Sequence, residues 1–556
     1  MTEMLNLTRR NLLKTTIASG LAVTPWISQV AAALENPERL KLFTHGVASG
    51  DPTHTSSVIW TRVSPKNGEA TLVNWELADD ERFRNVIRKG SIKASAERDF
   101  TVKVDVDGLK PGQMYYYRFK ADGLYSEPGR TRTLPEGKVD SLTIALASCS
   151  NYAFGYFNAY EVISADKDIQ FVLHLGDYLY EYGVEGWGGE ESKKLGREHQ
   201  PAHEIVSLAD YRERHGQYKS DPASRLMHAA HPLICIWDDH ESANNPFLHG
   251  AQNHQPDEGK WFERRDASVQ AYFEWMPVRD PAEGMRADEL WRSFEFGDLA
   301  TMITLETRHT GREEQVDYEE YLSNIKTPDQ RQQFMDEVMG NPQRDMLSPK
   351  MKAFYKVHLA QSVQKKQPWR LLGNQIPMAR IHLPKVNDIA AKQEDKTMGG
   401  YLYVGELDLP WYSDTWDGYG GAREHFYQMS REQGASDLLV LTGDSHSFWA
   451  NELFDGNGHP MGVELGTSGI SSPGDFLPYG ETIAAEMDQR MANHNREVRW
   501  TDGLHNGFVK LTVTPEKAVA DYVTVNTVTS TDYQVSLLKR IEIEKQGQHL
   551  SYTQGV

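Results

Sequence analysis

Cysteine is scarce in this sequence: only Cys149 and Cys235 occur among its 556 residues. Proteins whose fold depends on disulfide bonds contain many more, so a disulfide scaffold is excluded. Positive charge is also in deficit, because 59 Lys and Arg face 79 Asp and Glu, a formal net charge of −20. This balance argues against a surface for nucleic acid or anionic lipid. It does not exclude a phosphorylated substrate at a metal site, where bound cations dominate the local field.

Long apolar runs are missing as well, and no segment after the N-terminus is suited to span a membrane. At the N-terminus, Arg9 and Arg10 precede a moderately apolar stretch, residues 15–30, followed by three alanines. This pattern predicts a twin-arginine export signal over residues 1–33. An uncleaved membrane anchor is the alternative, but the stretch is short and contains Ser, Thr, Pro and Gln. We therefore expect passage through the twin-arginine export machinery and a periplasmic or secreted location.

Repeats and low-complexity segments are absent, and the mature chain divides into two patterns. Residues 41–136 alternate apolar and polar positions in runs such as 57–63 and 100–106, separated by short turns. Period-two alternation of this kind predicts a small β-sandwich. Residues 108–118 resemble the end of a fibronectin type III domain.

From residue 141 onward the pattern changes to buried strands and helices. An apolar strand at 142–147, a helical stretch at 155–164 and a strand at 171–175 predict a crossover unit, and hence a sheet flanked by helices. We take residues 141–556 as the catalytic domain. Its other predicted elements are a polar segment at 183–199, a helix at 207–219, and strands at 231–236, 300–305, 369–372, 438–441, 508–526 and 534–544.

Polar side chains gather where apolar segments end. The densest run is 236–245, which contains two adjacent aspartates, a histidine, a glutamate and two asparagines. Such a cluster repels itself unless a cation or protons neutralise it, so it predicts a metal site; a solvated acidic loop is the alternative. Similar runs lie at 173–180 and 439–446, and three such strand ends meeting in space would build one polynuclear centre. The candidate metal ligands are Cys149, Asp177, Tyr180, Asp238, Asp239, Asn244, Asp444 and His446.

The residue types indicate the kind of metal. A Cys149 thiolate and a Tyr180 phenolate suit Fe(III), whereas the Asn244 amide oxygen suits Ca or Mg. The alternatives are a buried cysteine or a disulfide with Cys235 for the thiol, and a buried aromatic for Tyr180. Asp238 could instead accept a hydrogen bond behind the ligands. The two ligands in Asp444-x-His446 are expected to face one side of a strand end.

Three further residues are candidates for contact with the substrate or the centre. His240 could protonate the leaving oxygen as a general acid, or only hydrogen-bond a bound phosphate. Arg308 could hold a phosphate oxygen or form a surface ion pair. Asn374 follows a predicted strand and could reach the centre. Cys235 lies within its predicted strand and is expected in the core.

Taken together, these motifs resemble the calcineurin-like metallophosphoesterases, and more closely the alkaline phosphatase D family. The resemblance is carried by Asp177, the run 239–241, Asp444-x-His446, the opening stretch 45–52 and the segment 208–222. It implies an α/β fold, an α/β/β/α metallophosphatase sandwich preceded by the fibronectin III-like β-sandwich domain. It also implies Fe(III) and Ca(II) as cofactors, with other divalent metals left open. Ser148-Cys149-Ser150 stands where more typical relatives have Asp-x-His.

The implied function is an exported phosphatase or phosphodiesterase that cleaves phosphate esters by attack of a metal-bound hydroxide and scavenges phosphate outside the cytoplasm. A phospholipase D-like diesterase acting on lipid head groups is one alternative. A non-catalytic secreted binding module, with the β-sandwich as its functional part, is the other. Some relatives cover the site with a terminal helix. Residues after 506 favour strands here, so the sequence does not decide whether a lid covers the site.

Overall fold

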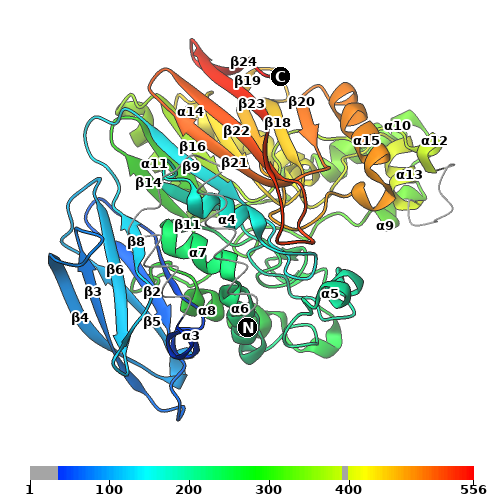
Figure 1. Ribbon diagram of the computed structural model, residues 1–556. Coiled ribbons are helices and arrows are strands. Elements are labelled where there is room, and N and C mark those ends of the chain that lie inside the picture. The colour runs from blue at the N-terminus through cyan, green and yellow to red at the C-terminus, as the bar shows by residue number, and fades with distance from the viewer. Residues whose placement is uncertain (1–35, 391–398) are drawn as a thin grey trace.

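The structure is a computed structural model that describes residues 36–390 and 399–556. The predicted export signal, 1–33, lies outside the described residues. Two large β-sheets stack face to face at the centre of the molecule (Figure 1). The first has ten strands in the order β24-β23-β22-β21-β9-β10-β11-β1-β2-β5. Its strands are β1 (Val47–Gly50), β2 (Ser57–Arg62), β5 (Thr101–Val106), β9 (Leu142–Ala147), β10 (Phe171–His174), β11 (Leu233–Cys235), β21 (Asn506–Val513), β22 (Lys517–Val525), β23 (Val535–Gln546) and β24 (His549–Gln554).

The second sheet has seven strands in the order β14-β15-β16-β17-β19-β18-β20. Four consecutive neighbours, β15, β16, β17 and β19, run parallel to one another, whereas the pairs β14–β15, β19–β18 and β18–β20 are antiparallel. The strands are β14 (Arg292–Phe296), β15 (Ala300–Thr304), β16 (Trp369–Gly373), β17 (Leu438–Thr442), β18 (Phe448–Phe454), β19 (Pro460–Gly466) and β20 (Val498–Asp502).

The central strands are apolar on both faces because both faces are covered. In β17, Leu439 and Leu441 point into the core between the sheets, while Leu438 and Val440 pack against helices. In β10, Leu173 faces the inter-sheet core and Val172 the helices outside. The two sheets therefore form one α/β/β/α sandwich, which confirms the predicted fold class.

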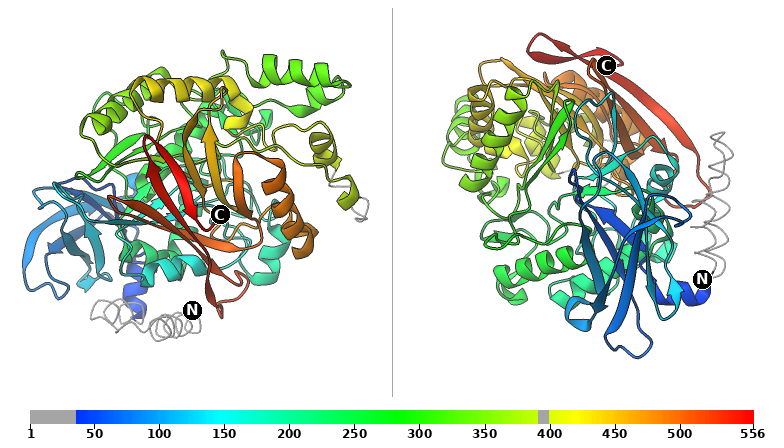
Figure 2. Two further views of the ribbon diagram at one scale, coloured as in Figure 1. Left: turned by 90° about the horizontal axis from the view of Figure 1, so that it is seen from above. Right: turned by 90° about the vertical axis from the view of Figure 1, so that its left-hand side faces the viewer.

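Helices cover the outer face of each sheet (Figure 2). One layer packs on the first sheet through α4 (Asn158–Ala165), α6 (Leu208–Ser220), α7 (Pro222–Ala230) and α8 (Trp261–Trp275). The other packs on the second sheet through α11 (Pro349–Gln364), α14 (Gly420–Glu432) and α15 (Glu481–His494). Local sequence sets the ends: Asp221 caps α7 by accepting from Ala223 N and Ser224 N, with Pro222 in the first turn. The predicted helix at 207–219 is confirmed as α6.

The N-terminal strands form a second sandwich at one side of the molecule. A five-stranded sheet packs on β2 and β5 through residues such as Tyr117 and Val102. The third strand of this inner layer, β1, pairs in parallel with β11 at Gly50 and Leu233. The first catalytic sheet thus continues into the N-terminal sandwich without a break. The five strands are β3 (Thr71–Ala78), β4 (Val86–Ala94), β6 (Met114–Ala121), β7 (Leu124–Tyr125) and β8 (Gly129–Arg132).

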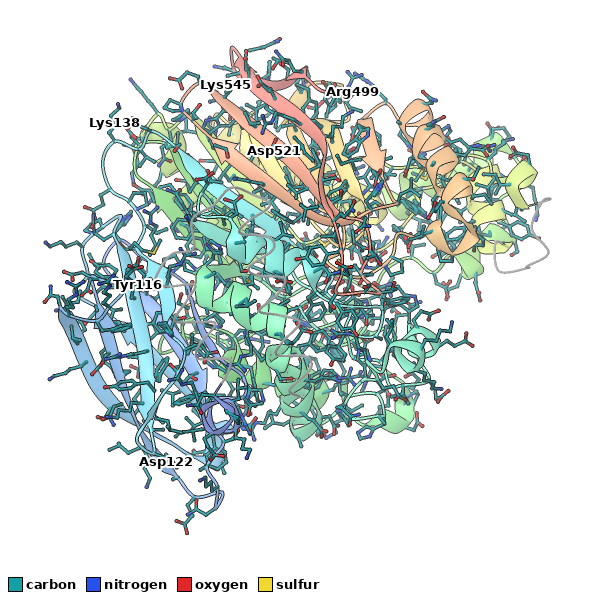
Figure 3. All side chains as sticks on the ribbon, viewed as in Figure 1. Tyr116, Asp122, Lys138, Arg499, Asp521 and Lys545 are labelled. Carbon is teal, nitrogen blue, oxygen red and sulfur yellow. The ribbon has the colours of Figure 1, made fainter. Side chains whose placement is uncertain are left out.

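The described chain ends in strands, as the sequence predicts, and no helix follows α15 within the described residues. Asp521 of β22 and Lys545 of β23 lie at the end of the molecule away from Asp122, which marks the N-terminal sandwich (Figure 3). Among residues 36–390 and 399–556, no helix has the length and apolar character needed to cross a membrane. The predicted polar segment at 183–199 contains a short helix, α5 (Gly189–Leu195). The other short helices are α3 (Pro37–Leu42), α9 (Tyr318–Leu322), α10 (Pro328–Phe334), α12 (Asn387–Ala390) and α13 (Gly399–Glu406).

Candidate metal centre and active site

Carboxyl ends of parallel strands from both sheets meet at one edge of the sandwich, where ligands bind in open α/β folds. Cys149 follows β9, Asp177 follows β10 and Asp239 follows β11, while Asp444 follows β17 of the other sheet. Hydrogen bonds tie these ends together: Cys149 N donates to Gly176 O at 3.2 Å, and Ser150 N to Asp177 O at 2.9 Å. The topology therefore brings candidate ligands from distant parts of the sequence to one place.

Four of these candidates have a backbone conformation that side chains other than glycine rarely adopt. Cys149, Asp177, Asp444 and His446 have φ angles of 58°, 54°, 66° and 53°. Such strain persists only where the surroundings impose it, and it concentrates at functional sites. Part of the restraint here comes from buried Glu241, whose carboxylate accepts from Asp177 N at 3.1 Å, Tyr178 N at 2.6 Å and Asp238 N at 2.8 Å.

The prediction that Asp444 and His446 face the same side of a strand end is wrong. Residues 444–447 form bends between β17 and β18, so the two side chains are not related by β alternation. The left-handed backbone at both residues sends them to different neighbours. Asp444 joins Asp238 and Asp239, whereas His446 joins Cys149 and Asp177. Both still reach the same edge of the sandwich.

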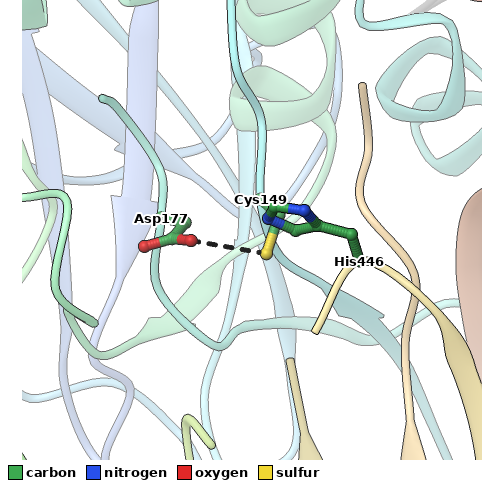
Figure 4. A group of neighbouring side chains, drawn as sticks. All are labelled: Cys149, Asp177 and His446. Atoms are coloured by element: carbon green, nitrogen blue, oxygen red, sulfur yellow. Dashed lines mark hydrogen bonds between the residues drawn. The ribbon is translucent and has the colours of Figure 1, made fainter. Parts of the chain in front are cut away.

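The first donor group combines soft and hard atoms. Donor atoms of Cys149, Asp177 and His446 lie within 4.8 Å of one another (Figure 4). The Tyr180 hydroxyl is 3.1 Å from Asp177 Oδ2 and 3.3 Å from His446 Nε2. His446 Nδ1 lies 3.1 Å from the Pro473 carbonyl, which can only accept, so Nδ1 carries the hydrogen and Nε2 presents a lone pair. Thiol, phenol, carboxylate and imidazole thus converge on one point.

The second donor group consists of carboxylates. Asp238, Asp239 and Asp444 place oxygens within 4.8 Å of one another. Burial, followed by the charge of Asp238, raises the pKa of Asp444 well above its usual range. Burial also raises the pKa of Asp238 to about 6, although Arg308 opposes the shift. Two buried carboxylates and a partly buried one lie in close contact. They are held together only at a cost in free energy, unless protons or cations balance their charge.

A third grouping joins the first two, because Asp177 and Asp239 approach each other together with His240. Burial and the neighbouring charge of Asp239 raise the pKa of Asp177 well above its usual range. Asp177 belongs to the first donor group and Asp239 to the second. The arrangement is therefore one of two adjacent donor sets connected through two carboxylates.

His240 is held by a residue that the sequence analysis missed. Glu181, fully buried, lies 2.7 Å from His240 Nδ1. Its other oxygen accepts from Asn244 N at 2.7 Å and Asn253 Nδ2 at 2.8 Å. Although burial lowers it, the pKa of His240 is raised well above its usual value by the charges of Asp239 and Glu181. The only signal in the sequence is an acidic residue directly after Tyr180, which no spacing rule distinguishes.

Arg308 is buried rather than exposed, so the surface ion pair considered for it is wrong. Its guanidinium lies 2.5 Å from Asp238 and 2.9 Å from Asp444, with Asp414 at 3.6 Å. Its Nη1 has no hydrogen-bond partner within the described part of the chain. The guanidinium balances part of the carboxylate charge, and its Nη1 faces Asp414 without forming a hydrogen bond.

Two other candidates lie at the margin of the centre. Asn244 donates its side-chain nitrogen to Gln252 at 2.9 Å. Asn374 uses both ends of its amide elsewhere, donating to Ile376 O at 2.6 Å and accepting from Trp416 Nε1 at 3.1 Å. Asn374 therefore supports the fold around the site. Cys235 lies in β11, and both cysteines are buried free thiols.

Comparison with known proteins decides the family. The sequence model described as PhoD-like phosphatase matches residues 144–522, and that of its N-terminal domain matches residues 29–135. The chain belongs to the PhoD-like phosphatase family. Alkaline phosphatase D of Bacillus subtilis (strain 168) is 35% identical over 515 residues, covering 89% of this chain and 79% of that protein. A solved structure, "Structure of PhoD", superposes with a TM-score of 0.75 at 31% identity, covering 93% of each chain.

Membership of the PhoD-like phosphatase family confirms the resemblance and places the chain among phosphoric ester hydrolases. In this PhoD-like phosphatase the donor sets fit metal ions on their own chemistry. Asp238 Oδ2 and Asp239 Oδ1 are buried and, among the residues described, find no hydrogen-bond partner. The single hydrogen of the Tyr180 hydroxyl faces two acceptors, Asp177 and His446. Unused lone pairs directed at a common point are what a cation requires.

Proposed function

We propose that this protein is an exported, metal-dependent phosphohydrolase that cleaves phosphodiesters, phosphomonoesters or both, and so releases phosphate outside the cytoplasm. The observation that carries the proposal is the pair of adjacent donor sets connected through Asp177 and Asp239. Two cations held side by side can bind one phosphate group through different oxygens. The family assignment supports hydrolysis of a phosphate ester.

The donor atoms favour a different metal in each set. Cys149, Asp177, Tyr180 and His446 offer thiolate, carboxylate, phenolate and imidazole, a combination suited to Fe(III). Asp238, Asp239 and Asp444 offer only carboxylate oxygens, which suit Ca(II). We assign Asn244 to the second set as a further oxygen donor. When bound, the cations would activate water as a nucleophile and balance the negative charge that develops on phosphate.

The residues around these sets carry the remaining steps. Glu181 holds His240 Nδ1, which leaves Nε2 on the side of the carboxylates, 3.9 Å from Asp239 Oδ2. The charges of Asp239 and Glu181 favour the imidazolium, so His240 has a proton to give to the leaving oxygen of the ester. The Nη1 of Arg308 forms no hydrogen bond and has only Asp414 nearby at 3.6 Å, so it can donate a hydrogen bond to a phosphate oxygen.

A chromogenic phosphodiester assay on the mature protein tests this proposal. We expect activity to fall on calcium chelation and to recover when calcium is added back. Metal analysis should find iron and calcium, with a visible charge-transfer band from thiolate or phenolate to Fe(III). The variant Asp177→Asn removes the carboxylate through which the first donor set meets Asp239 of the second, and it should reduce turnover at least about 1,000-fold. Asp140→Asn, at an exposed side chain, is the matched control. If Asp177→Asn hydrolysed the diester as fast as the wild type, the assignment of these residues to a catalytic metal centre would be refuted.

Export requires a separate test because the signal lies outside the described residues. The twin-arginine pattern predicts that replacing Arg9 and Arg10 by Lys blocks translocation. The full-length variant should then accumulate as an uncleaved cytoplasmic precursor, detected by fractionation and mass. Normal export of this variant would refute the twin-arginine route and leave the catalytic proposal untouched.

A further inference from the structure

One aromatic side chain beside the donor sets has no part in the chemistry above. Trp187 lies in the polar segment between β10 and α6, and its side chain is 37% exposed. Its ring stacks on the ring of His446, with centroids 5.4 Å apart and planes at 11°. Tyr180 and Tyr182 lie 5.6 Å and 6.4 Å away. This partly exposed aromatic therefore lies directly beside a candidate metal ligand.

The backbone presents Trp187 in a fixed position. Gly188 has a φ of +86°, and a Cβ there would lie 2.9 Å from the Phe154 ring. A Cβ at Gly189 would lie 2.2 Å from Val184 O. The Phe154 ring meets the indole edge to face at 4.6 Å. The turn therefore needs glycine on the C-terminal side of Trp187, and Phe154 supports the indole from beside.

Polar contacts fasten the segment at both ends. Val184 N donates to Ala202 O at 2.8 Å. Buried Arg197 donates to Tyr152 O at 3.0 Å and pairs with Asp221 at 3.0 Å. The part of the indole that remains accessible thus belongs to a built surface, held next to the metal-binding edge of the sandwich.

We propose that Trp187 forms a substrate subsite that stacks with a planar aromatic ester substituent of the phosphate ester. A planar group would continue the stack that His446 and Trp187 begin, whereas an aliphatic chain has no face to offer it. Aromatic stacking of this kind is directional and adds to apolar burial. This inference rests on the proposed function, because the phosphate group must be held by the donor sets for its substituent to reach Trp187.

Competitive inhibition by two phosphonates tests the subsite without depending on the chemical step. Phenylphosphonate and methylphosphonate share the anionic group and differ in the ring. We expect the wild-type enzyme to bind phenylphosphonate about fivefold more tightly than methylphosphonate. Trp187→Leu, which keeps apolar bulk without a ring, should remove this preference, and Trp187→Phe should retain most of it. Phe262→Ala, at an aromatic 45% exposed elsewhere, is the matched control.

The outcomes are distinguishable. An equal loss for both phosphonates in Trp187→Leu, or reduced iron content in that variant, would show that Trp187 only supports His446 and would overturn the inference. A phenyl preference that survives in Trp187→Leu would overturn it as well. If the wild-type enzyme neither hydrolyses phosphodiesters nor binds either phosphonate, the proposed function itself fails, and the subsite fails with it.

Discussion

At the scale of single residues, the contact between Glu181 and His240 decides which nitrogen of the imidazole is available. The 2.7 Å contact at Nδ1 fixes the ring and favours its charged form. Glu181 is a positioning residue, since it acts on the substrate only through His240. Carboxylates that orient a histidine in this way act as a unit with it, so their effects are not additive.

We therefore predict strong non-additivity between these two positions. Glu181→Gln should lower kcat about 10- to 100-fold with a smaller change in KM, since general acid catalysis contributes roughly 10²–10⁴-fold. His240→Asn should lower kcat further, and the double variant should be no worse than His240→Asn alone. Steady-state kinetics on a phosphodiester compares the wild type, the two single variants and the double variant. Fully multiplicative effects of the two substitutions would refute the coupling.

A second residue-scale prediction concerns glycine. Gly176 precedes Asp177 with a φ of +100°, and a Cβ there would lie 2.3 Å from Asp238 N and 2.8 Å from Asp238 Cα. Gly480 has a φ of +107° with open space around it. Alanine at Gly480 meets only backbone strain, about 1–2 kcal/mol. Alanine at Gly176 must also push β10 away from β11.

Unfolding midpoints in urea compare the two variants, and metal analysis accompanies them. We expect Gly176→Ala to be clearly less stable than Gly480→Ala and to lose metal, while Gly480→Ala retains its full complement. Equal stabilities would mean that the turn before Asp177 can relax, and that the left-handed ligand backbone is not imposed by its neighbours.

At the scale of elements, α4 contains a buried acid that faces the C-terminal strands. Glu161 is 5% exposed and accepts from the Tyr533 hydroxyl at 3.2 Å. Burial raises its pKa to about 7 from an ordinary 4.5. A folded-state pKa above the unfolded value means that folding favours the protonated acid. This contribution to stability is complete below about pH 4.5 and is lost as the pH rises through 7.

Glu161→Gln keeps the shape without the titration. We expect the variant to match the wild type at about pH 4 and to be more stable by about 3 kcal/mol at about pH 8. Urea unfolding at both pH values measures the difference, with exposed Glu190→Gln as the control. A variant that is less stable than the wild type at pH 8 would show that the ionised carboxylate is stabilised inside the fold.

The strands also show which parts of the fold and of the centre could be predicted from the sequence. Runs with both faces apolar, such as β10 and β17, predict buried strands because a two-sided core demands them. The polar residues at the ends of these runs include most of the donor atoms found in the centre. The bends at Asp444 and His446 were not predictable, since both residues have a left-handed backbone that side chains other than glycine rarely adopt. Glu181 and Trp187 were missed because their roles depend on contacts with His240 and His446, residues far away in the sequence.

At the scale of the whole molecule, the N-terminal sandwich is not a detachable module. Its strand β1 extends the first catalytic sheet beside β11, the strand that leads to Asp238 and Asp239. Buried polar contacts cross the same boundary: Arg225 of α7 pairs with Glu127 at 2.5 Å, and Trp60 Nε1 donates to Glu274 O at 2.8 Å. The core of the N-terminal sandwich also includes Leu226 of α7.

Deletion of residues 36–137 therefore exposes the edge of β11, the apolar face of α7 and Arg225, which loses its partner Glu127. An open strand edge next to newly exposed apolar surface promotes aggregation. We predict that the fragment 138–556 aggregates or fails to retain metal, as size-exclusion chromatography and metal analysis would reveal. The matched comparison is deletion of residues 548–556, which removes only the outermost strand, β24. A soluble, metal-loaded fragment 138–556 that hydrolyses phosphodiesters would show instead that β11 can end the sheet and that the N-terminal sandwich is dispensable for the centre.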